Sequence, residues 1–186
     1  MSKPIIVLVG YSGSGKNFIP KVLGMKYTPG NTTREKRDSD ESMTYHNIKE
    51  VKHFQNINLF DLKICGETYF HENYYWTSIK DYNDEQYDYM ILSPEGLMNL
   101  VKKHNFHKRL IEEKIKAGGI VPLDKYLYRD YKVVFFECSE RQRKKNMKKR
   151  GEKRSLIRKR IKNERELYKG IKDFIVKELN GIVINL

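Results

Sequence analysis

The feature that most constrains how this chain can fold is a glycine-rich loop that directly follows a short apolar run. Residues 5–9 read Ile-Ile-Val-Leu-Val, which is typical of a strand buried on both faces of a parallel sheet. Residues 10–16 then read Gly-Tyr-Ser-Gly-Ser-Gly-Lys and match the pattern GxxxxGK. In this context the glycines let successive backbone N–H groups wrap an anion, and the helix that follows adds its positive end. The pattern therefore predicts a phosphate-binding P-loop.

The residues predicted to bind the phosphates of ATP are Gly10, Ser12, Gly13, Ser14, Gly15, Lys16 and Asn17. Lys16 is expected to reach the β- and γ-phosphates. The position after this lysine usually holds Ser or Thr, whose hydroxyl binds Mg²⁺, but here it holds Asn17. The longer amide side chain favours a contact to Mg²⁺ through a water molecule, because Mg²⁺ dehydrates reluctantly. Mg²⁺, bound together with ATP, is the predicted cofactor.

Beyond the loop, strand-like runs alternate with helical patterns along the chain. The strand-like segments are 69–76, 87–92, 133–136 and 181–186. The helical segments are 16–24, 97–103, 108–116, 139–149 and 155–179. Such alternation is typical of an α/β fold with a mainly parallel sheet. Together with the P-loop, it predicts a single domain built as the three-layer sandwich of P-loop NTPases.

The composition describes a basic and highly charged protein, with 33% charged residues and a net charge of +13. A basic protein attracts phosphates, so the charge alone leaves nucleotides and nucleic acids both open as ligands. No apolar run approaches the roughly 20 residues that a membrane span needs, and residues 5–9 are too few for a signal-peptide core. The two cysteines, Cys65 and Cys138, form no CxxC pair, which argues against a disulfide framework or a thiolate zinc site. We therefore expect a cytoplasmic protein.

Further motifs follow the P-loop in a fixed order. They are Asn-Thr-Thr-Arg-Glu-Lys-Arg at 31–37 with Tyr45 beyond it, Asn-Tyr-Tyr-Trp-Thr at 73–77, and Arg-Gly and Arg-Ile at 150–151 and 160–161. In this combination the chain resembles the guanylate kinase family from Ile5 to about Glu166. That family carries a P-loop, then TTRxxR with a tyrosine just beyond, then NYYG, and finally a lid of the form RG…RL.

The resemblance implies a small acceptor-nucleotide-binding subdomain at about residues 30–80. The residues implied to bind the acceptor are Arg34, Arg37, Tyr45, Glu67, Tyr75, Thr77 and Glu95. Arg34 and Arg37 can fork onto the phosphate of the acceptor through charge-assisted hydrogen bonds. In the family, the tyrosines at the positions of Tyr45 and Tyr75 contact the same phosphate.

The family reads the acceptor's base with a hydroxyl residue after NYYG and a glutamate upstream. Thr77 fits the hydroxyl, and Glu67 fits the glutamate with an offset of one residue, while Glu72 is the less favoured alternative. A carboxylate suits guanine because it accepts hydrogen bonds from both N1–H and the N2 amino group, whereas adenine presents a lone pair at N1. The sequence departs from the family at Trp76, where the family has glycine. At the end of the central strand only Glu95 remains of an acidic pair.

The resemblance also implies how the rest of the chain is divided. The implied regions are a core at 1–24 and 86–186, a basic helical lid at about 140–162, and an insertion at about 105–130. The predicted catalytic residues are Lys16, Arg34, Arg150 and Arg160. Arg150 and Arg160 match the family's lid arginines, and Arg141 and Arg143 are nearby alternatives in the same basic stretch.

The sequence thus predicts a nucleoside monophosphate kinase that transfers the γ-phosphoryl group of ATP to GMP or dGMP, giving ADP and GDP or dGDP. Three other classes stay open: a kinase of another small phosphate, such as ribose bisphosphate or another nucleotide, a non-catalytic guanylate kinase-like binding module, and a nucleic-acid-binding protein. The acceptor arginines and the NYY motif favour a nucleotide, and Lys16 favours catalysis. We expect ATP and a nucleoside monophosphate as partners, with no membrane and no nucleic acid, and leave the oligomeric state open.

Overall fold

The computed structural model describes residues 2–36, 43–45, 64–70 and 73–186. The chain divides into two compact units. Unit 1 comprises residues 1–5, 27–88 and 95–130, and unit 2 comprises residues 6–26, 89–94 and 131–186. Residues 95–130 thus group with the segment predicted to bind the acceptor, although the sequence placed them with the core. Arg37 and the alternative base reader Glu72 lie outside the described residues.

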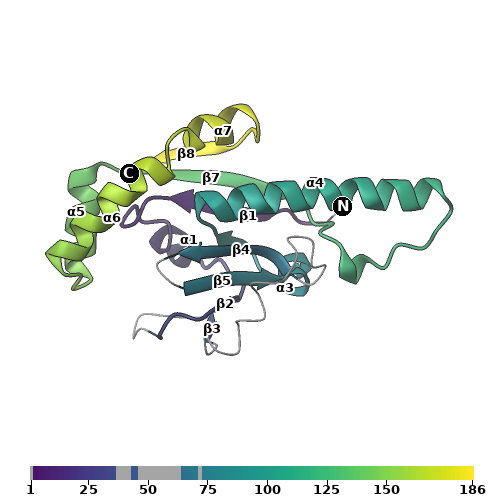
Figure 1. Ribbon diagram of the computed structural model, residues 1–186, viewed down its shortest axis with the longest axis horizontal. Coiled ribbons are helices and arrows are strands. Elements are labelled where there is room, and N and C mark those ends of the chain that lie inside the picture. The colour runs from purple at the N-terminus through teal and green to yellow at the C-terminus, as the bar shows by residue number, and fades with distance from the viewer. Residues whose placement is uncertain (1, 37–42, 46–63, 71–72) are drawn as a thin grey trace. The chain divides into compact units, whose positions relative to one another are not determined.

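Unit 2 is built on a four-stranded parallel sheet with the strand order β6-β1-β7-β8. Figure 1 labels β1, β7 and β8 of this sheet. Its strands are β1 (Ile5–Gly10), β6 (Tyr89–Ile91), β7 (Tyr131–Glu137) and β8 (Ile182–Asn185). Val7 lies opposite Met90 in the β1/β6 pair, and Phe135 lies opposite Val183 in the β7/β8 pair. Val7 and Phe135 are at most 1% exposed, as the apolar runs predicted. The predicted α/β fold with a parallel sheet is confirmed.

The helices of unit 2 are α1 (Phe18–Val22), α5 (Glu140–Lys149), α6 (Arg154–Leu167) and α7 (Ile171–Lys177). Helix α5 begins after Ser139, whose side chain accepts a hydrogen bond from the N–H of Gln142. The prediction of one basic helix over 155–179 is wrong, because α6 ends at Leu167 and α7 begins at Ile171. Gly170, between them, has a φ of 74°, a left-handed conformation that interrupts a right-handed helix.

Unit 1 contains a second, smaller sheet with the strand order β3-β2-β5-β4. Its strands are β2 (Gly30–Thr32), β3 (Met43–Tyr45), β4 (Ile64–Phe70) and β5 (Asn73–Ser78). Strand β5 pairs antiparallel with β2 and β4, and β2 pairs parallel with β3. The prediction of a single strand over 69–76 is wrong, because this aromatic run is shared between the end of β4 and the start of β5. Aromatic residues favour both strands equally, so composition could not mark where the chain reverses.

The described part of unit 1 also contains helical elements, and Pro94, the first residue of the longest of them, belongs to unit 2. They are α3 (Ile79–Asn83), α4 (Pro94–Lys116) and the 3₁₀ helix η2 (Leu123–Lys125). The sequence predicted two helices at 97–103 and 108–116, but α4 is continuous. Its buried face includes His104 and His107, whose polar character interrupted the apolar pattern in the sequence. Among the described residues, no helix has both the length and the apolar character that a membrane span requires.

Arg129 lies in the core of unit 1 and is fully buried. Its guanidinium donates hydrogen bonds to four backbone carbonyl oxygens, those of Lys3, Tyr82, Asp84 and Tyr87, at 2.7–3.3 Å. In return, the Tyr82 hydroxyl donates to the carbonyl of Arg129 at 2.8 Å. The segment predicted as an insertion therefore supplies a residue whose hydrogen bonds link several backbone segments of this unit.

His107 is a second buried polar residue of unit 1, and it predicts an acid-sensitive fold. Its Nδ1 accepts a hydrogen bond from the Leu127 N–H at 2.8 Å. Burial, reinforced by nearby Lys103 and His104, lowers the pKa of His107 from 6.5 to about 4. Between those pH values the unfolded chain binds a proton that the native state does not, so the free energy of unfolding falls as the pH decreases through this window.

Denaturant titrations from pH 7 to pH 4 measure this effect. A single such proton changes the free energy of unfolding by roughly 1.4 kcal/mol per pH unit. His107→Asn keeps a hydrogen-bond acceptor but does not titrate, so we expect a shallower dependence on pH in this variant. An equally steep dependence in both proteins would contradict the assignment to His107.

Candidate functional site

The P-loop of unit 2 joins the end of β1 to the start of α1, as the sequence predicted. Gly13 and Gly15 have φ values of 77° and 88°, in the left-handed region that favours glycine. A Cβ atom at Gly13 would also lie 2.7 Å from the carbonyl oxygen of Arg143. The loop therefore needs glycine at both positions, for conformation and, at Gly13, for space.

The carbonyl groups of the loop are tied down by side chains. The bonds run from Tyr168 Oη to the oxygen of Gly10 at 2.8 Å, from Lys16 Nζ to that of Tyr11 at 3.0 Å, from Arg143 Nε to that of Ser12 at 3.1 Å, and from Asn146 Nδ2 to that of Gly13 at 2.7 Å. Arg143 and Asn146 belong to α5, and Tyr168 caps the end of α6. These helices therefore fix the orientation of successive peptide groups in the loop.

Several N–H groups of the loop are available to a ligand. Those of Gly13, Gly15, Lys16 and Asn17 form no hydrogen bond within the described part of the chain. The hydroxyl of Ser14, a residue only 1% exposed, also has no partner there. Unpaired backbone N–H groups on consecutive residues at a helix start form an anion-binding concavity. The loop thus has the geometry of a phosphate cradle.

Lys16 lies among several charged groups of the same unit. Burial of its ammonium group lowers the pKa of Lys16 from 10.5 to about 8, the carboxylate of Glu164 opposes this shift, and the guanidinium groups of Arg150, Arg143 and Arg160 add to it. All three arginines are therefore close enough to act electrostatically on the lysine. Of the predicted catalytic residues, the structure brings together Lys16, Arg150 and Arg160.

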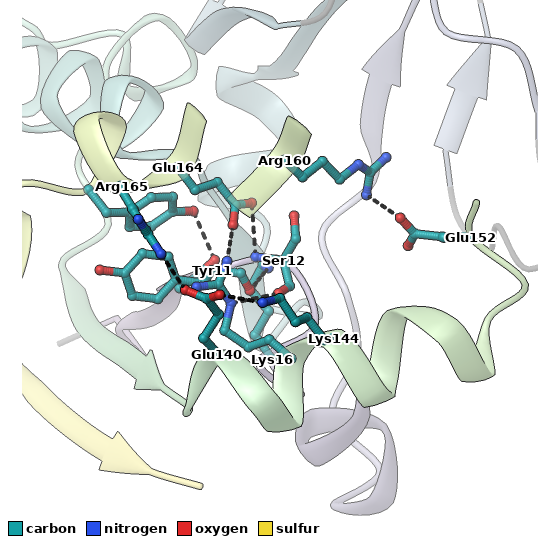
Figure 2. A network of polar contacts seen from close by, with 12 residues as sticks. Tyr11, Ser12, Lys16, Glu140, Lys144, Glu152, Arg160, Glu164 and Arg165 are labelled. Atoms are coloured by element: carbon teal, nitrogen blue, oxygen red, sulfur yellow. Dashed lines mark hydrogen bonds and ion pairs between the residues drawn. The ribbon is translucent and has the colours of Figure 1, made fainter. Parts of the chain in front are cut away.

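The two predicted lid arginines differ in their surroundings. Arg150 caps the C-terminal end of α5 and is exposed. Arg160 lies on α6, where it forms an ion pair with Glu152 at 3.2 Å (Figure 2). Its side chain is 14% exposed, and its Nε–H is buried without a partner among the described residues. A guanidinium with a buried N–H that has no partner is suited to bind an anionic ligand.

Sequence reasoning missed Glu164, a carboxylate in direct contact with this loop. Glu164 accepts a hydrogen bond from the Ser12 N–H at 3.0 Å and pairs with Arg143, with both side chains no more than 6% exposed. The signal was present in the sequence, because Glu164 continues the buried stripe of α6 that Ile157 and Ile161 begin. A carboxylate at an apolar position of an amphipathic helix requires a buried partner.

The predicted acceptor-binding residues lie in unit 1. Arg34 follows β2, and its guanidinium donates to the carbonyl oxygen of Glu35 at 2.8 Å. Tyr75 and Thr77 alternate on β5, so both point to the same face of the small sheet. Tyr45 belongs to β3, where its backbone pairs with that of Thr32. Glu95 is exposed in the first turn of α4.

The register of β4 and β5 separates the two residues expected to read guanine. Glu67 lies opposite Trp76, whereas Thr77 lies opposite Gly66. Because successive positions of a strand alternate between faces, the positions of Glu67 and Thr77 belong to opposite faces of the sheet. The backbone register therefore does not put these two positions on one face of the sheet.

Asn17 is the one predicted contact for Mg²⁺. It is exposed at the N-cap of α1, and its side chain makes no capping hydrogen bond. Within the described ranges, no group of three or more His, Cys, Asp or Glu residues could hold a metal ion. A single neutral oxygen donor fits an ion that arrives with nucleotide phosphates, since Mg²⁺ usually binds through few protein ligands and several waters.

With this geometry established, comparison with known proteins concerns the fold. No protein-family model matches the sequence, and no curated protein matches it. Among solved structures, the chain is similar to guanylate kinase from Anaplasma phagocytophilum, with a TM-score of 0.50 and 13% sequence identity over 99% of this chain and 77% of that one. The chain has a guanylate kinase-like fold. At this identity the likeness extends to the fold alone, so the chemistry rests on the residues of the site.

Proposed function

We propose that this protein is an ATP-dependent phosphotransferase that moves the γ-phosphoryl group of MgATP to a nucleoside monophosphate. The observation that carries the proposal is which backbone groups of the P-loop are hydrogen-bonded and which are available to a ligand. Its carbonyls are bonded to α5, α6 and Lys16, while the N–H groups of Gly13, Gly15, Lys16 and Asn17 remain available to an anion. The guanylate kinase-like fold supports a kinase.

Phosphoryl transfer requires charge neutralisation and positioning more than covalent help from the protein. Lys16 would bind the β- and γ-phosphates, and Arg150 and Arg160 would stabilise the charge on the transferred group. The Mg²⁺ of the substrate would neutralise part of the phosphate charge, with Asn17 holding one of its waters. The buried hydroxyl of Ser14 offers a further donor to a phosphate oxygen.

For the acceptor, Arg34, Arg37, Tyr45 and Tyr75 are proposed to bind the monophosphate. The resemblance in sequence favours GMP or dGMP as the acceptor. The separation of Glu67 from Thr77 weakens this assignment, because the two side chains were expected to read one base together. We therefore propose the class of acceptor, a nucleoside monophosphate, and rank GMP and dGMP as the first members to test.

The same separation favours a second candidate function, a kinase of another small phosphate such as ribose bisphosphate. A coupled ADP-release assay decides between the two. The acceptors are all ribo- and deoxyribonucleoside monophosphates together with ribose 1,5-bisphosphate. The proposal predicts stimulated ADP release with one or more monophosphates, and stimulation by the sugar phosphate alone would replace it with the second candidate. A lack of stimulation by any acceptor would leave a non-catalytic binding module.

Replacing Arg34 tests the acceptor site. We expect Arg34→Ala to raise the KM for the monophosphate about 10- to 100-fold, since a hydrogen bond to a charged group contributes about 1.5–3 kcal/mol. The KM for ATP should stay unchanged. Lys36→Ala removes an exposed positive charge nearby and serves as the matched control. An increase confined to the KM for ATP would assign Arg34 to the donor instead.

Replacing Arg160 tests the proposed lid. We expect Arg160→Ala to lower kcat by about 10²-fold, because the guanidinium would act on charge that develops in the transition state. Arg158→Ala removes an exposed arginine from the same helix and should retain nearly normal kcat. Equal losses in both variants would show that the general positive charge of α6, rather than Arg160 itself, supports the reaction.

A further inference from the structure

A single residue of the P-loop, Ser12, is held at both of its backbone groups by one ion pair. Its N–H donates to Glu164 Oε1 at 3.0 Å, and its carbonyl oxygen accepts from Arg143 Nε at 3.1 Å. Arg143 and Glu164 also bond to each other through Nη2 and Oε2. Figure 2 shows the carboxylate of Glu164 directed toward Ser12 and the loop.

Burying this ion pair costs more desolvation free energy than burying an apolar contact would. Its two side chains are 6% and 4% exposed, so both charges have lost most of their hydration. Apolar residues of similar volume in place of a buried ion pair are often neutral or even stabilising. Stability of the helix packing alone therefore does not explain the charges. The hydrogen bonds of Arg143 and Glu164 to Ser12 explain the charges, because a leucine or methionine side chain could not hydrogen-bond to a peptide N–H or carbonyl.

The pair also connects the loop to the helices that carry the lid arginines. Arg143 belongs to α5, which Arg150 caps, and Glu164 lies on α6 one turn after Arg160. Arg143 further stacks over the ring of Tyr11, with its Cζ 4.3 Å from the ring centroid. The orientation of the loop and the placement of both arginines are thus joined through the same two side chains.

We propose that Arg143 and Glu164 are positioning residues that act as one unit. The pair fixes the peptide groups of Ser12, keeps the following N–H groups turned toward the anion, and holds α5 and α6 at the loop. The identity of that anion as the triphosphate of ATP rests on the proposed function. The positioning role of the pair does not depend on the proposed function, so the experiment can test the two separately.

The same helices provide a matched control. Arg165 of α6 and Glu140 of α5 form a second ion pair at 2.8 Å, with side chains 69% and 35% exposed. Within the described structure, neither of these two side chains hydrogen-bonds to the loop. The two pairs therefore share the helices that they join and differ in contact with the P-loop.

The experiment compares two double variants. The first combines Arg143→Met and Glu164→Leu, and the second combines Arg165→Met and Glu140→Leu. The first readout is amide hydrogen exchange at Ser12 and Ser14 in the absence of nucleotide, because their N–H groups donate hydrogen bonds to Glu164 and to the carbonyl of Tyr11. We expect exchange there to become about tenfold faster in the first double variant, from the loss of roughly one hydrogen bond's free energy, and to stay unchanged in the second. The second readout is the KM for ATP, which should rise about tenfold in the first variant alone, with the KM for the acceptor unchanged.

Unchanged exchange and an unchanged KM for ATP in a folded Arg143→Met, Glu164→Leu protein would overturn the proposal. If that protein does not fold, Arg143→Lys, which keeps a positive charge beside Glu164 but removes the Nε–H that binds the Ser12 carbonyl, is measured in the same way, and unchanged loop exchange would again overturn the proposal. Loop exchange that accelerates in a protein without phosphotransferase activity would support the positioning role and reject the proposed function.

Discussion

Replacing Lys16 with alanine should lower the rate of phosphoryl transfer by about 10³-fold while the protein stays folded. The ammonium group would bind charge that moves between the β- and γ-phosphates during transfer, and removal of one such preorganised donor costs about 3–4 kcal/mol of transition-state stabilisation. The fold should persist, because the residue as a whole is half-buried and, among the described residues, the side chain of Lys16 donates a hydrogen bond within its own loop, to the carbonyl of Tyr11.

Lys145→Ala is the control for this experiment, because it removes an exposed lysine from α5. Turnover and the thermal unfolding midpoint are measured for both variants and for the wild type. We expect Lys145→Ala to match the wild type in turnover. Near-normal turnover of Lys16→Ala would reject the P-loop as the donor site.

Replacing Arg129 with methionine should have the largest effect on stability. The substitution removes a fully buried guanidinium and leaves the four carbonyl groups that it binds without their donor. We expect a loss of about 3–5 kcal/mol in the free energy of unfolding, as when one partner is removed from a buried charged network. Denaturant titration measures this loss.

Arg109→Met provides the comparison, since Arg109 is exposed on α4. Its free energy of unfolding should stay within about 0.5 kcal/mol of the wild type, as is usual for surface substitutions. If Arg129→Met and Arg109→Met have similar small effects, the carbonyl network around Arg129 does not hold unit 1 together.

Local patterns predicted the P-loop side of the protein well. The apolar run at 5–9, the glycines of the loop and the strands near 87–92, 133–136 and 181–186 were each read from a few neighbouring residues. The structure has β1, β6, β7 and β8 at these places. Such features depend on periodicity and on glycine conformation, which a single sequence displays directly.

The predictions that failed depended on tertiary context. Helix α4 continues through His104 and His107 because packing in unit 1 buries them, although these polar residues interrupt the apolar pattern from which a helix is predicted. Gly170, in a left-handed conformation, lies between α6 and α7 where composition favoured one long basic helix. Glu164 and Arg129 escaped notice because the value of a buried charge depends on partners far away in the sequence.

The acceptor side shows a different limit. The motif around Arg34 was assigned to the acceptor through its resemblance to the guanylate kinase family. Whether Glu67 and Thr77 act on one base depends on strand register, and a shift of one residue moves a side chain to the other face. The observed pairing of Glu67 with Trp76 is therefore information that the sequence motif did not contain.

The most direct test of the central claim follows the phosphoryl group itself. The purified protein is incubated with ATP labelled at the γ-phosphate, Mg²⁺ and each nucleoside monophosphate, and the labelled products are separated. The account predicts that label appears in a nucleoside diphosphate in amounts equal to the ADP formed, that EDTA abolishes the transfer, and that Lys16→Ala nearly abolishes it. Label that remains in ATP, or appears only in inorganic phosphate, with every monophosphate tested would contradict the account.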